Sequence, residues 1–353
     1  MAGQHVIAPF DPAAAGADLW KRYHELRRIR QAESRPGDPI RRDDLEEQRI
    51  SREDPFHIQH RYEISAGDTM LSWYYGHTVR PGTASYETNK HLYWVDVYVR
   101  PDQRRRRIGA SWLALTLELA ERHGCTTIGM GAEEESGHAF LRWLGADEKL
   151  KGAENRLALA EVDWAMLRRW TAEGAQRSPA TRLEIHDGPL PEALWASYAP
   201  QITTMLRTMP FEGLDVGELL VTPDHLREWY TQMRLFGDEI HTVLTREPDG
   251  NISAVTEAIW SPHRETIVHQ MFTGVLPEAR GRGLGKWVKA AMLLHLSQTH
   301  PAARWVATDN AGSNAPMLAI NKKLGFKEYR TGSDYQITRE RLAARLAELK
   351  VRA

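Results

Sequence analysis

The stretch RGRGLGKW, residues 280–287, lies between a run with the pattern of a β-strand and a run with the pattern of a helix. The preceding residues, ETIVHQMFTGV, are rich in β-branched and apolar side chains, which predicts a strand over about 266–275. Gly281, Gly283 and Gly285 stand at alternate positions, where they expose backbone N–H groups and permit dihedral angles that other residues avoid. The following helix adds its own unpaired N–H groups and the positive end of its dipole. The stretch therefore predicts an anion cradle suited to a phosphate or pyrophosphate.

Two common nucleotide motifs do not fit this turn. A P-loop requires glycine at the first position and Ser or Thr after the lysine, whereas this chain has Arg280 and Trp287. A dinucleotide fingerprint requires G-x-G-x-x-G, but the glycines here follow G-x-G-x-G. The alternative that the glycines serve only tight packing remains open on this motif alone.

A near-copy of the turn, RRRRIGAS at 104–111, indicates an internal repeat. Trp20 precedes Arg104 by 84 residues, and Trp195 precedes Arg280 by 85. Each turn is followed by an amphipathic helical pattern, a short strand-like run and a second helix that ends in Leu-Gly. We therefore expect two α/β domains, residues 1–172 and 182–353, joined by the small and polar segment 171–181.

The composition excludes several classes of protein. The chain has 353 residues, 42% of them apolar and 26% charged, which is ordinary for a soluble globular protein. A formal net charge of -1 argues against a nucleic-acid binder, so PDQRRRR is a local basic feature. No run of 18 apolar residues predicts a membrane span. The single Cys125 suits a reducing compartment, and we expect a cytoplasmic protein without a secretory signal.

The pattern [Arg/Gln]-x-x-Gly-x-[Gly/Ala] between a strand and a helix resembles the acyl-CoA pyrophosphate loop of the GNAT N-acetyltransferase superfamily. Arg280, Gly283 and Gly285 match it. The later segment TDNAGSNAPMLAINKKLGF, 308–326, places Asn314 where family members hold the pantetheine arm of CoA. The combination resembles a bacterial tandem-domain subgroup with the architecture of mycothiol synthase.

This resemblance implies two tandem GNAT-like domains, each with a mixed, mostly antiparallel sheet flanked by helices. It implies acyl transfer, with acetyl-CoA as donor and the amine of a small molecule as acceptor, and without a covalent enzyme intermediate. The implied CoA contacts are Val275, Leu276, Arg280, Gly281, Arg282, Gly283, Gly285, Lys286, Asn310 and Asn314 in the later copy, and Val99, Arg104, Arg107 and Gly109 in the earlier one. Asn310 and Asn314 have helix capping as an alternative role.

The earlier copy departs from the pattern at several positions. Arg107 replaces Gly283, and a required positive φ would there cost about 1–3 kcal/mol of strain. Glu134 takes the place of Asn314, and Ala146 that of Phe326. We therefore expect a degenerate CoA loop in the N-terminal domain and catalysis in the C-terminal one. Arg107 could also hold the 3′-phosphate of a CoA or remain a solvated basic side chain.

The chemistry requires a base, an oxyanion donor and an acid. An alkyl ammonium has a pKa of about 10, so a base must take a proton; His269 is the first candidate and Glu257 the second. A hydrogen-bonded core role is the alternative for His269. In this fold a backbone N–H at the end of the fourth strand, Val275 or Leu276, would stabilise the oxyanion. The resemblance implies a tyrosine acid at the position of Asn321, so water or a tyrosine from elsewhere, such as Tyr329, would have to serve.

That replacement supports an alternative from another class, a non-catalytic acyl-CoA-binding scaffold with tandem GNAT folds. The sequence shows no Cys and His residues at ligand spacing, so no metal site is expected. The acceptor, the length of the acyl group and the oligomeric state cannot be read from these residues.

Overall fold

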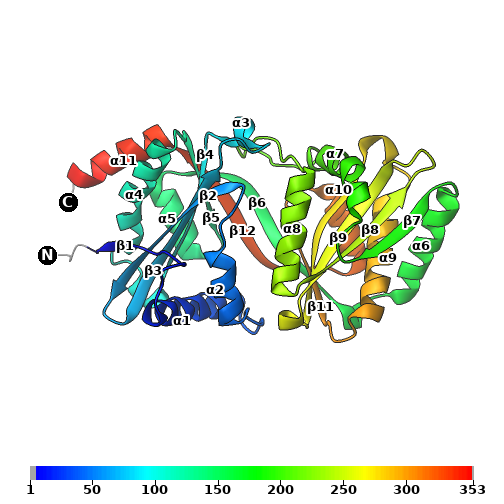
Figure 1. Ribbon diagram of the computed structural model, residues 1–353, viewed down its shortest axis with the longest axis horizontal. Coiled ribbons are helices and arrows are strands. Elements are labelled where there is room, and N and C mark those ends of the chain that lie inside the picture. The colour runs from blue at the N-terminus through cyan, green and yellow to red at the C-terminus, as the bar shows by residue number, and fades with distance from the viewer. Residues whose placement is uncertain (1–4, 352–353) are drawn as a thin grey trace. The chain divides into compact units, whose positions relative to one another are not determined.

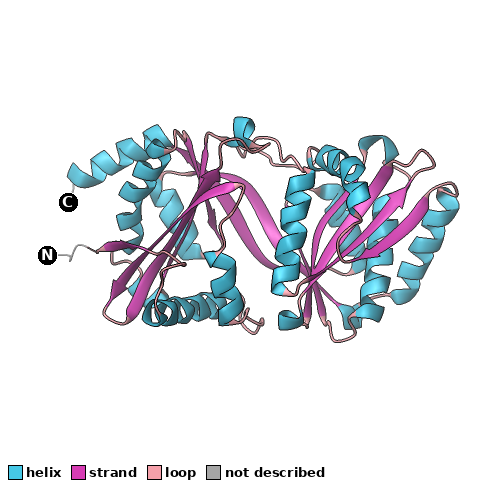
Figure 2. Cartoon of the chain, viewed as in Figure 1, coloured by secondary structure: helices cyan, strands magenta, loops and turns pink. Residues whose placement is uncertain are grey.

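The computed structural model describes residues 5–351, which form two compact units (Figure 1). The first unit contains the chain up to Lys151, the segment Phe211–Glu218 and the chain from Gly332 onward. The second unit contains Gly152–Pro210 and Leu219–Thr331. Each unit has a mixed sheet flanked by helices, as Figure 2 shows, which confirms the predicted α/β class.

The sheet of the first unit has the strand order β1-β2-β3-β4-β5-β12. Its pairs are antiparallel except for the parallel pair β4–β5. The strands are β1 (Ile7–Pro9), β2 (His57–Ala66), β3 (Thr69–Val79), β4 (Leu92–Val99), β5 (Thr127–Ala132) and, from Gly332, β12 (Lys327–Thr338). The helices are α1 (Ala17–Ser34), α2 (Asp43–Ser51), α3 (Tyr86–Asn89), η1 (Pro101–Gln103), α4 (Ile108–Arg122), α5 (Glu135–Leu144) and α11 (Arg339–Val351).

The second unit repeats this topology with the order β6-β11-β10-β9-β8-β7, in which β10–β11 is the parallel pair. Its strands are β6 (Asp147–Ala158, from Gly152), β7 (Arg182–Asp187), β8 (Glu239–Arg246), β9 (Ile252–Trp260), β10 (Ile267–Val275) and β11 (Trp305–Ala311). Its helices are η2 (Leu159–Glu161), α6 (Trp164–Arg177), η3 (Glu192–Leu194), α7 (Trp195–Leu206), α8 (Pro223–Phe236), η4 (Pro262–Arg264), η5 (Pro277–Ala279), α9 (Leu284–Thr299) and α10 (Ala315–Leu324).

The compact units do not coincide with the expected domains 1–172 and 182–353. Residues 152–158 of β6 pair with β11, and α6 packs on α9, so the end of the first copy lies in the second unit. Residues 333–338 of β12 pair with β5, and α11 packs on α4 in the first unit. The sequence repeat identifies equivalent segments, but it does not specify which of two similar strands completes a given sheet. Because the two strands are equivalent elements of the repeat, either of them can complete the open edge of either sheet.

Helix α9 is the centre of the second unit's core. One side packs against β8 and β9, and another side packs against α6. Val288, Met292, Leu293 and Leu296 are fully buried, and each such side chain contributes about 1.5–3 kcal/mol by leaving water. This double coverage explains why the run following the glycine-rich turn is apolar on most of its faces.

Candidate functional site

Each parallel strand pair separates towards its carboxyl end. Strand β10 pairs with β11 only over residues 267–269 and 305–307. In the first unit, β4 pairs with β5 only over 92–95 and 127–130. Beyond these residues the backbone groups on the facing edges have no partner strand. Each sheet therefore opens a split beside the turn that follows β10 or β4.

The hydrogen bond of Leu276 shows which groups of β10 face this split. Its N–H donates to the Ser253 carbonyl oxygen over 2.9 Å, on the β9 side. Because alternate residues of an antiparallel pair face opposite ways, the N–H of Val275 points to the split. The N–H of Leu276 is therefore not free to donate to an oxyanion, whereas the N–H of Val275 points into the split where an oxyanion could bind.

A β-bulge distinguishes the two sheets at this place. The register between β10 and β9 shifts between Gln270 and Thr273, so that two residues of β10 lie opposite Glu257. The equivalent pairing of β4 with β3 runs without a shift from Trp94 to Val99. A bulge turns neighbouring groups out of the ladder and is common beside active sites. Only the split of the second unit has this feature among the paired residues described.

The two glycine- and arginine-rich turns have the same backbone conformation. Gly281 and Gly283 have φ values of 80° and 84°, and Arg105 and Arg107 have φ values of 65° and 63°. Within the described chain, the N–H groups of 281–285 donate to no backbone carbonyl or side chain. The backbone of the second turn therefore has the free N–H groups of the predicted anion cradle. Arg107 has the positive φ that the repeat led us to expect at this position.

Replacing both Arg105 and Arg107 by glycine is expected to stabilise the first unit. A left-handed conformation costs a non-glycine residue about 1–2 kcal/mol, partly offset by the greater freedom of glycine in the unfolded chain. Both side chains are exposed, and neither forms a hydrogen bond within residues 5–351. We expect a gain of about 1 kcal/mol per substitution in urea unfolding. Glycine at Arg106, which has no positive φ, is the matched control and should not stabilise.

The arginines that open the two turns differ in their surroundings. Arg280 is exposed, and within the described chain its guanidinium has no ion pair. Arg104 donates from both terminal nitrogens to the Glu33 carboxylate at 2.6 Å, and its Nε donates to the carbonyl oxygen of Val99 at 3.2 Å. The arginine that opens the second turn is therefore available to an anion, whereas the one that opens the first turn is paired with a carboxylate.

Glu33 is held in its charged form. Burial alone would raise the pKa of its carboxyl group, but hydrogen bonds from Arg104 and from the Tyr98 hydroxyl outweigh burial and lower the pKa. An anion that entered the first turn would have to displace this carboxylate. The sequence indicated a weak first copy from Arg107, Glu134 and Ala146, and Glu33 adds a cause that lies outside those positions.

The remaining predicted residues of the second turn have mixed roles. Arg282 forms an ion pair with Glu247 at 2.8 Å, so only its backbone N–H remains for an anion. The Lys286 ammonium lies 5.4 Å from the ring centroid of Trp170. A Cβ at Gly283 would lie 3.4 Å from one terminal nitrogen of Arg177, whose other terminal nitrogen forms an exposed ion pair with Glu173 at 3.4 Å. Arg177 comes from the exchanged helix α6, and no signal in the sequence places it here.

Gly285 and Gly109 line the floor of the two splits. A Cβ at Gly285 would meet Val275 and Ile320 at 3.5 and 3.6 Å, which is ordinary contact. A Cβ at Gly109 would lie 3.3 Å from the ring of Phe140, which fills the corresponding space.

Three amides meet near the split of the second unit. The Asn310 side-chain oxygen accepts hydrogen bonds from Asn321 at 2.8 Å and Asn155 at 3.3 Å, so Asn310 belongs to an amide cluster and caps no helix. Asn314 does cap α10, because its side-chain oxygen accepts from the Met317 N–H. Its amide nitrogen can still donate to a ligand. Asn321 is buried where family members have the tyrosine acid.

The two candidate bases lie on one face of the second sheet, the face covered by α7 and α8 (Figure 1). His269 lies opposite Ile259, which is two residues from Glu257 on β9. The Glu257 carboxylate accepts a hydrogen bond from the Tyr198 hydroxyl at 2.8 Å. Burial raises the pKa of Glu257 and therefore makes it a stronger base than an exposed carboxylate. Glu257 also lies directly across from the bulge.

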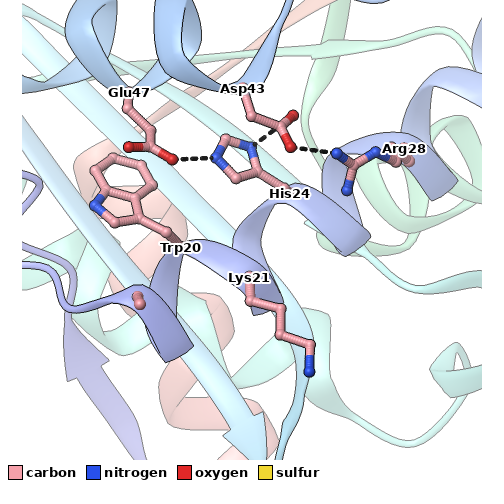
Figure 3. Close-up of a pocket in the computed structure, with 7 residues that line it drawn as sticks. Trp20, Lys21, His24, Arg28, Asp43 and Glu47 are labelled. Carbon is pink, nitrogen blue, oxygen red and sulfur yellow. Dashed lines mark hydrogen bonds and ion pairs between the residues drawn. The ribbon is translucent and has the colours of Figure 1, made fainter.

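A separate surface pocket of about 520 Å³ lies between α1 and α2 in the first unit (Figure 3). Figure 3 shows His24 between the carboxylates of Glu47, at 2.9 Å, and Asp43, at 3.4 Å. The Nε2 atom of His24 is hydrogen-bonded to Glu47, whereas its Nδ1 atom only approaches Asp43. The pocket contains no residue of the turn or of the split, so it does not belong to the candidate site.

Comparison with known proteins identifies the fold. Residues 23–146 match the family model described as "Acetyltransferase (GNAT) family". A tandem GNAT protein from the clavulanic acid biosynthesis pathway, solved without acetyl-CoA, superposes with a TM-score of 0.73 at 19% identity, covering 95% of this chain and 98% of that one. A GCN5-related N-acetyltransferase from Sphaerobacter thermophilus gives 0.63 at 11% identity, covering 95% and 96%. No curated protein sequence matches the chain.

The chain therefore has a tandem GNAT architecture, as the sequence resemblance predicted. The family match and this fold together support an acyltransferase enzyme. Among the described residues, no helix has both the length and the apolar character needed to cross a membrane.

Proposed function

We propose that the protein is an acyl-CoA-dependent N-acyltransferase of the cytoplasm that transfers an acetyl group from acetyl-CoA to the amine of a small molecule. Catalysis takes place in the second unit. The observation that carries this assignment is the difference between the two turns: Arg280 is available beside unpaired N–H groups, whereas Arg104 is paired with Glu33. The family match supports the reaction class.

In this proposal, the pyrophosphate of acetyl-CoA lies on the N–H groups of 281–285, where Arg280 and Arg177 add positive charge. The pantetheine arm enters the split between β10 and β11, where the outward carbonyl oxygen of Val275 can accept a hydrogen bond from it. The free amide nitrogen of Asn314 donates to the same arm. The thioester then emerges on the α7 and α8 face, where Glu257 lies.

The reaction forms one C–N bond and breaks one C–S bond. Glu257 takes a proton from the ammonium of the acceptor, directly or through one water, and the free amine attacks the thioester carbon. A backbone N–H at the split, such as that of Val275, stabilises the oxyanion. Collapse releases the CoA thiolate, and the proton lost by the new amide nitrogen passes through water to the thiolate, because Asn321 cannot supply one at neutral pH.

The direct test is incubation with acetyl-CoA and a panel of small amines, with release of the CoA thiol as the readout. Thiol release that depends on one class of amine is the expected result. Tight binding of acetyl-CoA without thiol release for any amine would favour the alternative, a non-catalytic acyl-CoA-binding scaffold. That alternative is kept because a buried asparagine occupies the acid position.

Replacing Glu33 by alanine is expected to create a second acetyl-CoA site. The substitution frees Arg104, whose charge-assisted hydrogen bonds to a phosphate contribute about 1.5–3 kcal/mol, or roughly 10- to 100-fold in affinity. Calorimetry of the full chain should give one tight equivalent for the wild type and two for the variant. Glu25→Ala is the control, because Glu25 lies on the same helix as Glu33 but pairs with Arg100. Unchanged stoichiometry in Glu33→Ala would show that the ion pair does not close the first turn.

A further inference from the structure

Five ligand-type side chains converge at the far end of α9 from the glycine-rich turn. His241 and Glu239 lie on β8 and Asp187 ends β7. His295 lies in the C-terminal half of α9, and His300 is its C-cap. All five lie in the second unit. Because α9 has 16 residues, about 24 Å separates this cluster from the turn. The cluster is therefore independent of the proposed acyl-CoA site.

The Asp187 carboxylate sets the tautomer of His241. The Nδ1 of His241 lies 2.6 Å from the Asp187 oxygen, which can only accept a hydrogen bond when ionised. His241 is almost completely buried, so its Nδ1 carries the proton and its Nε2 presents a lone pair. A histidine that donates one N–H to a carboxylate while its other nitrogen faces inward is the arrangement common to zinc ligands.

The lone pair of His241 points at a second imidazole. Its Nε2 lies 2.7 Å from the Nε2 of His300, and the Glu239 carboxylate lies 3.7 Å from the same His300 atom. The indole of Trp260 stacks on His300 with 4.3 Å between ring centroids, which fixes the plane of the imidazole. One ligand atom from each of His241, His300 and Glu239 thus lies within 4.8 Å of the other two, and Glu239 is exposed to water.

We infer that this cluster is a binding site for a divalent zinc-class cation, with His241 Nε2, His300 Nε2 and Glu239 as ligands and water in the fourth position. Two histidines and one glutamate with an open position are an established zinc ligand set. Zinc ligands at 2.0–2.1 Å lie about 3.3 Å apart in a tetrahedron, so the two imidazoles move apart by a few tenths of an ångström on binding. Asp187 is a positioning residue, and it also accepts a hydrogen bond from His295 at 2.7 Å.

The first unit contains the same histidine pair without the acids. His60 on β2 and His123 at the end of α4 face each other with 3.2 Å between their Nε2 atoms. The Nδ1 of His60 meets the Tyr93 hydroxyl at 3.1 Å instead of a carboxylate. Among the described residues, the groups of three or more ligand-type side chains that could hold a metal all belong to the second unit. The repeat therefore supplies an internal control, because only one of its two histidine pairs has acidic partners.

The test is a zinc titration of metal-free full-length protein against a chromophoric chelator. We expect one Zn²⁺ per chain with a dissociation constant on the order of 1 µM or tighter. His300→Ala should weaken binding by at least about 100-fold, and His123→Ala should leave it unchanged. Asp187→Asn should weaken it by about 10- to 100-fold through loss of orientation. Co²⁺ should give the visible absorption of a tetrahedral site in the wild type.

Glu239→Gln is the second variant, in case a histidine variant fails to fold. Because Glu239 is exposed, we expect its replacement to leave the fold intact. It should retain the wild-type unfolding temperature without metal and lose at least about tenfold in zinc affinity. Wild-type zinc affinity in Glu239→Gln and His300→Ala would overturn the inference, as would the absence of saturable binding in the wild type. Loss of binding on His295→Ala with full retention on His300→Ala would also overturn the assigned ligands, since the ion would then lie at the Nδ1 side of His241.

Discussion

Replacing Glu257 by glutamine is expected to lower kcat for acyl transfer by roughly 10²- to 10⁴-fold, the range typical of a lost general base. The KM for acetyl-CoA should change by no more than about twofold, because Glu257 does not contact the phosphate-binding turn. Glutamine keeps the size of the side chain and can still accept the hydrogen bond of Tyr198. Steady-state kinetics with a responsive amine give both parameters.

His269→Gln separates the two candidate bases. If Glu257 is the base, this variant should retain most of its activity and the acid limb of its pH profile. Because burial raises the pKa of Glu257, that limb should lie above the range of an exposed carboxyl group. Loss of the limb in His269→Gln, with an active Glu257→Gln, would return the role to His269.

Glu257→Gln should also increase the free energy of unfolding, and the sign of this change follows from the pKa of Glu257. The pKa of Glu257 is higher in the folded protein than in the unfolded chain, so the folded state holds its proton more tightly. Wild-type stability therefore falls, relative to glutamine, as the pH rises through the folded pKa. Below the ordinary carboxyl pKa the two proteins should unfold alike. Urea unfolding at a series of pH values measures this widening difference, and a constant difference would contradict the buried-base assignment.

The sequence predicted the features that depend on local backbone chemistry. Glycines at 281 and 283 adopt left-handed conformations, and the apolar spacing after them predicted α9. The repeat spacing predicted that a second turn of the same geometry exists at 104–109. These patterns can be recognised from the order of residues along the chain, so they require no knowledge of tertiary contacts.

The missed features all join residues that are distant in the sequence. Glu33 reaches Arg104 across 71 positions, and nothing in a highly charged helix distinguishes this glutamate from its neighbours. His241 and His300 are 59 positions apart and lack the close ligand spacing of zinc motifs. The exchange of β6 and β12 was also invisible, because the two copies offer interchangeable strands. Periodicity identifies an element but not its partner.

Replacing Arg280 by alanine is expected to raise the dissociation constant for acetyl-CoA by roughly 10- to 100-fold. Arg280 is the available cation of the second turn, and hydrogen bonds between charged groups contribute about 1.5–3 kcal/mol. The loss should appear in KM with kcat nearly unchanged, because the pyrophosphate binds equally in the ground and transition states. Calorimetry and steady-state kinetics measure the two effects independently.

Arg104→Ala is the matched control for this prediction, since Arg104 holds the equivalent position in the first turn. Its guanidinium is already bound by Glu33, so its removal from the wild type should change acetyl-CoA affinity by less than about twofold. In the Glu33→Ala background the same substitution should abolish the second equivalent of acetyl-CoA, because the freed arginine then binds phosphate. Equal losses on Arg280→Ala and Arg104→Ala in the wild type would contradict the assignment of the active site to the second unit. That outcome would mean that an incoming phosphate displaces Glu33 readily, and that the ion pair does not decide which turn binds.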